Sequence, residues 1–504
     1  MGVAQPVYLD YAATTPVDPA VAEAMDRCLK EAGGWGNPSS LHVFGRRAAA
    51  RIERARDQVA ALIGADPEEI VFTSGATESD NLTLLGVPRA NAHRGRHVLS
   101  SRIEHKAVLD PCRRLEKDGF RVTLVSPDRT GRIDPQAVAA ALQPDTVLVS
   151  VMLVNNETGV GQDVEAIGGL CRARGIPFHT DAAQAVGKIP IDLRVLPIDF
   201  MSFTAHKLYG PKGIGALYVR AGARPHLQPL AFGGGQERGL RPGTLPTHQI
   251  VGFGLACELA REALPAESRR LATLREELWR ELAVLGGVHL NGEPAPRVPG
   301  ILNVSFEGVE GESLVSGLSE LAVSTGAACN SASAEPSYVL RALGRDSELA
   351  QSSLRFSFGR FTTPAELRRA AGALRREIGR LRALSPAAED LERSADGPRM
   401  LPMGDTEVVG EAGGPGREVW VRFRLAVRDE SVRKASFKAY GCPHTLAVAE
   451  WLAGQLPGRR RTELLPGTPV DWARRLAVPL EKLGRLLVLE DALRECLRVW
   501  PIGV

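Results

Sequence analysis

Between about residues 60 and 260, short apolar runs alternate with segments of helical periodicity, and this alternation restricts the fold more than any other feature of the chain. Apolar runs such as Ile70–Thr73 and Gly215–Val219 are typical of strands that are buried on both faces. Where strands alternate with helices, the strands are usually parallel and the helices cover both faces of the sheet. The sequence therefore predicts an α/β fold with a mostly parallel sheet.

Reactive side chains follow several of these expected strands. Lys207 comes shortly after the apolar run 199–204, and Asp181 ends the run 176–181. The carboxyl ends of parallel strands meet at one edge of an open sheet, where such folds bind ligands. A buried lysine can form a Schiff base with pyridoxal phosphate, and an acid such as Asp181 can keep the pyridine nitrogen protonated. We therefore expect a pyridoxal-phosphate site, although a lysine after a strand is, taken alone, more often a surface residue.

Further polar segments fall at the same expected edge. Residues 73–81 join a strand to a helix, and their small side chains and free N–H groups suit either a phosphate or a simple helix cap. His105 and Asn156 follow two other strands, where they are either ligand contacts or turn and capping residues. The convergence of these groups with Lys207 and Asp181 favours a binding site.

Two residues in the second half of the chain have the chemistry of a catalytic site. Cys329 lies in the segment 324–337, which is rich in Ala, Ser and Gly and lacks the side chains that would hold a cysteine in a core, so we interpret it as a reactive thiol. Arg355 lies on an expected strand and requires a buried anion, which is either a substrate α-carboxylate or a structural acid.

The chain of 504 residues is too long for one compact core, and its composition divides it. Residues 1–385 form one α/β unit, with a large domain at about 20–260 and a small domain built from the N-terminal segment and residues 265–385. A helix is expected from Ser268 to Leu285. Residues 386–416 are rich in Pro, Gly and acids and are interpreted as a linker. Residues 417–504 form a third, α+β domain that begins with a hairpin.

Charge and cysteine usage exclude several classes of protein. A net charge of +3 predicts neither a nucleic-acid nor a membrane partner, and the balance is +6 in residues 416–504 and −3 elsewhere. The seven cysteines contain no C-x-x-C pair, so neither a disulfide framework nor a metal site is expected. No leader and no run of 18 apolar residues is visible, and we expect a cytoplasmic protein.

Taken together, the motifs of residues 7–385 resemble those of the cysteine desulfurases, which are fold-type-I pyridoxal-phosphate enzymes of the class V aminotransferase group. The matching segments are 8–16, 36–40, 73–81, 104–105, 155–157, 180–184, 202–207, 241–246 and 327–331. The long segment around Cys329 resembles the branch that supplies sulfur for iron–sulfur cluster assembly.

The resemblance implies a role for each matching residue. Lys207 would carry the cofactor and move protons, with Asp181 on the pyridine nitrogen. The other cofactor contacts would be Gln184 at the ring hydroxyl, His105 on the ring face, Asn156, and Ala76, Thr77, Thr204 and His206 at the phosphate.

The same resemblance implies the substrate and the assembly. Asn156 and Arg355 would hold the carboxylate of L-cysteine. Cys329 would take the sulfur as a persulfide and L-alanine would be released. Thr244 would reach the phosphate of the other subunit, which implies a homodimer. The sulfur would then pass to acceptor or scaffold proteins.

Residues 404–500 resemble the U-type iron–sulfur scaffold family in the segments 435–447 and 489–493. Such scaffolds bind a cluster through three cysteines, and only Cys442 remains here, so the domain is interpreted as a degenerate scaffold. The expected helix after Cys442 would favour its thiolate, and Cys442 is either a sulfur relay or a structural remnant. Two alternatives remain open: a selenocysteine lyase or other lyase of the same fold, and a scaffold protein with a fused sulfur donor.

Overall fold

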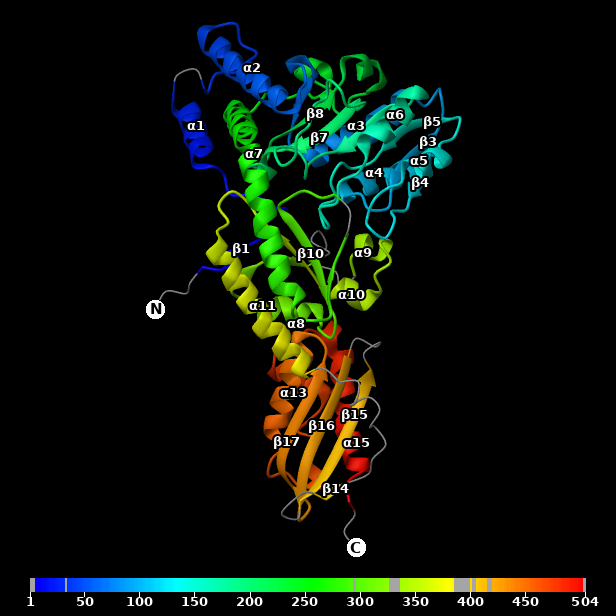
Figure 1. Ribbon diagram of the computed structural model, residues 1–504, viewed down its shortest axis with the longest axis vertical. Helices are drawn as coiled ribbons and strands as arrows, with labels where there is room; N and C mark the ends of the chain where they lie inside the picture. The colour runs from blue at the N-terminus through cyan, green and yellow to red at the C-terminus, as the bar shows by residue number, and fades with distance from the viewer. Residues whose placement is uncertain are drawn as a thin grey trace.

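The computed structural model describes residues 5–31, 34–292, 296–325, 336–384, 399–400, 405–414 and 419–501. Three domains follow one another along the long axis of the molecule (Figure 1). The C-terminal domain lies at the end opposite the large domain, with the small domain between them. None of the helices in these ranges is long and apolar enough to cross a membrane.

The large domain is built on a seven-stranded sheet with the order β2-β8-β7-β6-β5-β3-β4. Only β8 runs antiparallel to its neighbours, so the predicted mostly parallel sheet is confirmed. The strands are β2 (Ile70–Thr73), β3 (His97–Ser101), β4 (Arg121–Val125), β5 (Thr146–Ser150), β6 (Phe178–Asp181), β7 (Phe200–Thr204) and β8 (Gly215–Val219). Six of these strands, all but β4, are buried at every residue on both faces.

Helices cover the sheet and connect its strands. Asp163 and Asp134 cap two of them with their side chains, which satisfies N–H groups that have no partner within the helix. The helices of this domain are α1 (Pro19–Lys30), α2 (Val43–Ile63), α3 (Ala76–Ala90), α4 (Lys106–Lys117), α5 (Pro135–Ala141) and α6 (Val164–Ala173). Gly64 ends α2 at φ +65, in the left-handed region that favours glycine.

The helix expected from Ser268 begins about six turns earlier, at Thr247. In the structure α7 (Thr247–Ala283) is continuous through Pro265 and passes from the large domain into the small one (Figure 1). Its first half buries small residues such as Gly254 against α2, and its second half buries leucines of the small domain. In the first half of α7 the apolar residues do not mark the start of a helix, and Pro265 interrupts the pattern. The sequence therefore did not indicate where α7 begins.

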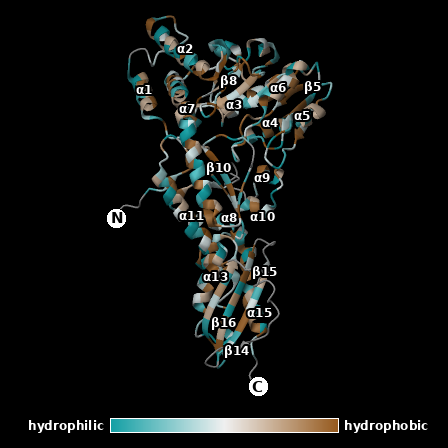
Figure 2. Ribbon diagram, viewed as in Figure 1, coloured by the Kyte–Doolittle hydropathy of each residue, from teal (hydrophilic) through white to brown (hydrophobic). Residues whose placement is uncertain are grey.

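The small domain combines the N-terminus with the residues after the middle of α7. Strand β1 (Val7–Tyr8) pairs in parallel with β11 (Leu321–Ala322). A second, antiparallel sheet has the order β12-β13-β10-β9. Its strands are β9 (Val288–Leu290), β10 (Ile301–Phe306), β12 (Ser324–Thr325) and β13 (Ser353–Ser357), and the helices are α8 (Gly311–Gly317), α9 (Tyr338–Ala342), α10 (Ser347–Gln351) and α11 (Pro364–Leu384). The hydrophilic side of α11 is visible in Figure 2.

The C-terminal domain contains an antiparallel sheet and two main helices. The expected hairpin is confirmed: β16 (Val419–Arg428) pairs with β17 (Ser431–Tyr440), and positive φ angles at Asp429 and Glu430 make the tight turn that hairpins prefer. The other elements are β14 (Arg399–Met400), β15 (Thr406–Gly414), α13 (Pro443–Gln455), α14 (Pro469–Arg475) and α15 (Leu483–Arg498).

The linker predicted at 386–416 requires a correction. Strand β15 falls inside it and pairs with β16 from Thr406 to Gly414, so the sheet of the third domain starts well before residue 417. Gly410 is placed where a side chain would meet the backbone of Ala492 in α15, which explains part of the glycine content that suggested a linker. Glycine here permits close packing between helix and strand.

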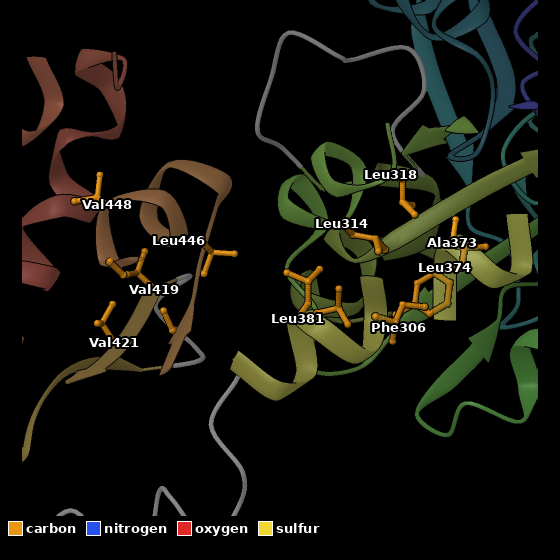
Figure 3. Packing of buried hydrophobic residues seen from close by; sticks show 14 of the residues in the cluster. Phe306, Leu314, Leu318, Ala373, Leu374, Leu381, Val419, Val421, Leu446 and Val448 are labelled. Atoms are coloured by element: carbon orange, nitrogen blue, oxygen red, sulfur yellow. The ribbon is translucent and has the colours of Figure 1, made fainter. Parts of the chain in front are cut away.

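The C-terminal domain packs directly on the small domain. Figure 3 shows Leu446 of α13 pointing toward α8 and α11, where Leu314 and Leu381 lie, and all three are buried in one hydrophobic cluster. Polar contacts accompany this packing: Ser313 donates a hydrogen bond to the carbonyl oxygen of Gly441 at 2.8 Å. The cluster is continuous between the two domains, and we infer that they form one packed body.

The pair Arg56–Glu237 gives a test of the large domain. Both side chains are buried at 2.8 Å, and Glu237 also accepts the N–H of Phe72 at 2.7 Å. Glu237→Ala should lower the free energy of unfolding by about 3–5 kcal/mol, because it leaves a buried guanidinium without its partner. Glu53→Ala, which removes the exposed second partner of Arg56, should cost less than about 1 kcal/mol. Denaturant unfolding of both variants measures this, and equal losses would contradict it.

Candidate active site

A cavity of about 590 Å³ lies at the carboxyl edge of the large sheet. This volume is within the range of small-molecule sites. The expected site residues that line it come from the ends of four strands, the start of α3 and strand β13 of the small domain. They are Ala76, Thr77, His105, Asn156, Asp181, Gln184, Thr204, His206, Lys207 and Arg355. The structure therefore brings together ten residues that are far apart in the sequence.

One end of the cavity is suited to an anion. Helix α3 begins at Ala76, after Gly75 in a backbone conformation that L side chains rarely adopt, at φ +156. The first N–H groups of this 15-residue helix and the positive end of its dipole favour a phosphate. Thr204 and His206 lie on the other side of this end. Burial lowers the pKa of His206 to about 4, so its ring is neutral and can donate one hydrogen bond.

The lysine of the site is held by the N-terminal segment. Lys207 Nζ donates to the carbonyl oxygen of Ala12 at 2.9 Å, and Gln184 Nε2 donates to the same oxygen at 2.8 Å. Lys188 Nζ donates to Gln184 Oε1 at 2.7 Å. Burial, followed by the charges of Lys207 and Arg355, lowers the pKa of Lys188 to about 7. The amine of Lys207 is therefore positioned in a region that already holds positive charge.

Asp181 and His105 lie at the opposite side of the same cavity. Asp181 is almost fully buried, and its Oδ1 accepts the N–H of Ala183 at 2.8 Å. His105 caps α4, since its Nδ1 accepts the N–H of Ala107 at 3.1 Å, so the ring proton is on Nε2. Burial lowers the pKa of His105, although the charge of Asp181 opposes this effect. The capping interpretation of His105 is thus correct, and it does not exclude a role in the cavity.

Arg355 has the buried acid that one of its two alternatives predicted, while its contact with a substrate carboxylate stays a prediction. Its Nη2 forms an ion pair with Asp10 Oδ1 at 2.9 Å, and its Nη1 donates to the carbonyl oxygen of Asn156 at 2.8 Å. Within the described residues, however, Arg355 Nε and Asn156 Oδ1 are buried without a hydrogen-bond partner. Buried polar atoms are normally paired, so these two indicate a polar ligand.

These observations fit pyridoxal phosphate. The helix start and the neutral His206 suit its phosphate, Asp181 suits a protonated ring nitrogen, and Lys207 can bond to its aldehyde carbon. The unpaired atoms of Arg355 and Asn156 leave capacity for a second polar molecule, as a substrate carboxylate would require. Among the described residues, no group of three or more His, Cys, Asp or Glu could hold a metal ion.

Three expected site residues are not placed in this cavity. Cys329 lies outside the described residues. Thr244 is exposed and does not line the cavity, as expected of a residue assigned to another subunit's phosphate. Cys442 belongs to the third domain and is fully buried. This burial favours the structural alternative for Cys442, because sulfur transfer to it would require the interface around it to open.

The surroundings of Cys442 explain its burial. It caps α13, as its sequence position predicts, and its Sγ lies 3.5 Å from Thr445 Oγ1. Arg485 of α15 forms a side-chain hydrogen bond with Cys442 and is attracted to Glu312 of the small domain. Lys482 Nζ forms an ion pair with Glu312 at 2.9 Å. The thiol is thus enclosed where the third domain meets α8.

Sequence reasoning missed four residues of this region: Asp10, Asp80, Glu104 and Lys188. Asp80 lines the cavity from α3, and it belongs to the segment 73–81, whose sequence indicates a phosphate site or a helix cap but no particular role for Asp80. Glu104 is buried next to His105, and burial, followed by the charge of Asp181, raises its pKa to about 8. For Asp80 the available signal was an acid within an expected apolar helix, and for Glu104 it was an acid next to the candidate site residue His105.

Comparison with known proteins identifies a matching family. The model of the family described as aminotransferase class-V matches residues 7–369. The cysteine desulfurase IscS of Pectobacterium atrosepticum is 57% identical over 392 residues, which cover 78% of this chain and 97% of that protein. The cysteine desulfurase IscS of Azotobacter vinelandii is 58% identical over 382 residues, covering 76% and 95%.

Solved structures show the same similarity. A NifS-like protein superposes with a TM-score of 0.69 at 38% identity and covers 74% of this chain and 100% of its own. The structure titled SspA in complex with cysteine has a TM-score of 0.63 at 40% identity, with coverages of 71% and 99%.

The enclosure of Cys442 leads to a prediction about its reactivity. In the native protein, alkylation of Cys442 should be slow, because the thiol is buried at the interface with α8. Glu312→Lys should accelerate it severalfold, since the new lysine repels Lys482 and Arg485. Glu320→Lys is the control, because Glu320 lies on the same domain and pairs only with the exposed Arg376 within the described residues. Peptide mass spectrometry follows Cys442 directly, and equal rates in the two variants would contradict the proposed enclosure.

Proposed function

Because the chain belongs to the class-V aminotransferase family, we propose that it is a pyridoxal-phosphate-dependent cysteine desulfurase. It removes the sulfur of L-cysteine and releases L-alanine, and the sulfur supplies iron–sulfur cluster assembly or other acceptors. The observation that carries this proposal is the cavity that unites Lys207, Asp181 and Arg355 in a chain 57% identical to proteins named cysteine desulfurase. A lysine, an acid and a carboxylate-binding arginine are the groups that this chemistry requires.

Different residues of the cavity bind different parts of the cofactor. The start of α3, Thr77, Thr204 and His206 bind the phosphate, while Gln184 binds the ring hydroxyl. The Asp181 carboxylate would accept a hydrogen bond from the protonated ring nitrogen, and His105 would cover the ring. When bound, pyridoxal phosphate supplies an electron sink for the bonds at the substrate's Cα. Lys207 Nζ takes and returns the proton at that carbon.

The substrate is held by its carboxylate. Arg355 lines the cavity, and its Nε has no hydrogen-bond partner among the described residues, while Asp10 and the Asn156 carbonyl fix its other nitrogens. The Asn156 amide has one unpaired end, and rotation of the amide places its NH₂ group there. This pairing orients the amino group and sulfur of the substrate cysteine. It contributes to the rate enhancement because the reacting groups are held close together.

The sulfur is taken by Cys329, an assignment that rests on the resemblance of residues 327–331. The Cys329 thiolate attacks the substrate sulfur, so that an S–S bond forms as the Cβ–S bond breaks. Protonation of the carbon then gives L-alanine, and Cys329 is left as a persulfide. Thiol and L-cysteine are thus converted to persulfide and L-alanine with no external oxidant.

The protein functions as a homodimer in this proposal. Trp35, Leu41 and Phe232 are large apolar side chains with exposed fractions of 62%, 88% and 80%, which is unusual for a monomer surface. Thr244 is exposed on the same domain and is available to the phosphate of a second copy. Light scattering tests this assembly, and a monomeric mass would contradict it.

The third domain is a degenerate U-type scaffold-like domain that docks on the enzyme in cis. Its packing on α8 and α11, and the pairing of Lys482 and Arg485 with Glu312, support a docking role. Arg485 occupies the position at which the scaffold family has a cysteine ligand. It contacts the one ligand cysteine that remains, Cys442. We therefore favour docking over relay for this domain, and the alkylation of Cys442 described above distinguishes an enclosed from an accessible thiol.

Lys207→Ala tests the cofactor assignment. The variant should lose the absorbance of the covalently bound cofactor, incorporate no label on borohydride reduction, and form L-alanine from L-cysteine at least about 10³-fold more slowly, since it lacks the proton-transfer group. Lys117→Ala, which changes an exposed lysine of α4, is the control. Alanine formation at the wild-type rate by Lys207→Ala would refute the proposal.

Cys329→Ser separates substrate binding from sulfur transfer. The variant should still show the change in cofactor absorbance on addition of L-cysteine, because Lys207 and Arg355 are intact. Under reductant it should release no sulfide above background. Cys112→Ser is the matched control, because burial raises the pKa of the Cys112 thiol to about 12 and keeps it unreactive. Sulfide release by Cys329→Ser at the wild-type rate would show that another thiol attacks.

A further inference from the structure

A group of buried polar residues lies between α3 and the sheet, next to the cavity. Asp80 of α3 and His179 of β6 are fully buried, and Asp80 Oδ1 lies 3.5 Å from His179 Nε2. His179 also forms hydrogen bonds with Ser202 on β7 at 2.9 Å and with Ser150 on β5 at 2.8 Å. These contacts join one helix and three strands through polar side chains in an otherwise apolar core.

This group is placed beside Asp181 by the geometry of the strands. His179 and Asp181 are two residues apart on β6, so their side chains point to the same face of the sheet. Ser202 is the direct register partner of Asp181 on β7. Asp80 lines the cavity from the helix that packs on this face. Asp80 and Asp181 therefore approach the same region from a helix and a strand.

No described group balances a negative charge on Asp80. Neither of its oxygens has a hydrogen-bond partner of normal geometry in the described part of the chain. The neighbouring imidazole of His179 is neutral, because burial lowers its pKa to about 3. The ionisable groups that act on Asp80 are Asp181 from β6 and Glu104 from the loop after β3, and both are acids. An isolated buried carboxylate is costly and takes up a proton instead.

The electrostatic effects on Asp80 agree with this geometry. Burial, followed by the charge of Asp181, raises the pKa of Asp80 well above its usual range, and the Ser202 hydroxyl opposes this only in part. Burial and the neighbouring acid therefore both favour the protonated, neutral form of Asp80. Glu104, with a pKa raised to about 8, is mostly neutral at neutral pH.

We propose that Asp80 is a positioning residue whose carboxyl group stays protonated, so that Asp181 is the one carboxylate of this buried group that faces the cofactor. The proposal rests on the role of Asp181 in the proposed function and extends it to a residue outside that machinery. Two close carboxylates cannot both ionise at low cost, and the proton settles on one of them. With the proton on Asp80, the negative charge of this buried group is assigned to Asp181, which would keep a ring nitrogen protonated. The neutral acid also supports Ser202 and His179 under Asp181.

The experiment compares Asp80→Asn with Asp80→Ala in the full-length protein. Asparagine has the shape and charge of a protonated aspartate, so Asp80→Asn should keep the pH dependence of the bound-cofactor absorbance and should change the dissociation constant of pyridoxal phosphate by less than about threefold. Asp80→Ala removes the supporting group and should weaken cofactor binding by about tenfold. Thr83→Val is the control, because Thr83 is a buried residue of the same helix whose hydroxyl bonds only to the Ser79 carbonyl within the described structure.

Two results would overturn the proposal. A shift of the absorbance titration in Asp80→Asn as large as in Asp80→Ala would show that Asp80 acts as an anion. Wild-type binding and titration in Asp80→Ala would show that it positions nothing.

Infrared difference spectroscopy gives a readout that does not depend on the cofactor or on the folding of the alanine variant. The spectrum of the wild type minus that of Asp80→Asn, both without cofactor at neutral pH, should contain the C=O stretching band of a protonated carboxyl group, and Glu104 cancels because both proteins contain it. A carboxylate band in its place would overturn the proposal. Failure of the wild type to bind pyridoxal phosphate would instead refute the proposed function, and the infrared result would still report the proton on Asp80.

Discussion

The hydrogen bonds of the N-terminal segment hold the two domains of the enzyme unit and the cavity in one arrangement. Ala12 accepts hydrogen bonds from both Lys207 and Gln184, and its own N–H donates to Ser357 of the small domain. Asp10 pairs with Arg355 on β13. The Ala12 carbonyl belongs to the backbone, so no side-chain substitution removes it. The position of Lys207 therefore depends on the path of the backbone at Ala12. The path is fixed because β1 is paired with β11 and because Thr15 bonds to the backbone near Lys207.

The sequence predicted the sheet edge and most of the cavity, because both follow from local rules. Polar residues after buried strands, such as Asp181 and Asn156, must lie at the carboxyl edge once the strands are parallel. It did not predict partners that depend on tertiary packing. Lys188 is seven residues after Asp181 and reaches the site only because the chain turns back, so that its amine meets Gln184. The ion pair of Asp10 with Arg355 joins residues 345 positions apart, and no periodicity indicates it.

The third domain shows a different limit of sequence reasoning. Its hairpin and both main helices were predictable, because alternation and helical periodicity are local signals. The strand β15 was misread as linker, since its glycines accommodate the close approach of α15 and thereby lower the apolar content that marks a strand. The burial of Cys442 could not be foreseen either. Helix capping makes a thiol reactive only when solvent reaches it. Arg485 of the same domain contacts Cys442, and the small domain closes over this region through Ser313, which bonds to Gly441, and Glu312, which attracts Arg485.

Burial shifts the pKa values of several ionisable groups in the cavity toward their neutral forms. Removal from water disfavours the charged form of every ionisable group, so it lowers the pKa of Lys188 and His206 and raises that of Asp80 and Glu104. Burial thus favours the neutral form of each of these four groups. Arg355 keeps its charge because a guanidinium loses its proton only far above neutral pH and because Asp10 pairs with it. A small anionic substrate entering this cavity therefore meets a fixed positive group at one end, while the neutral acids beside Asp181 add no repulsion against it.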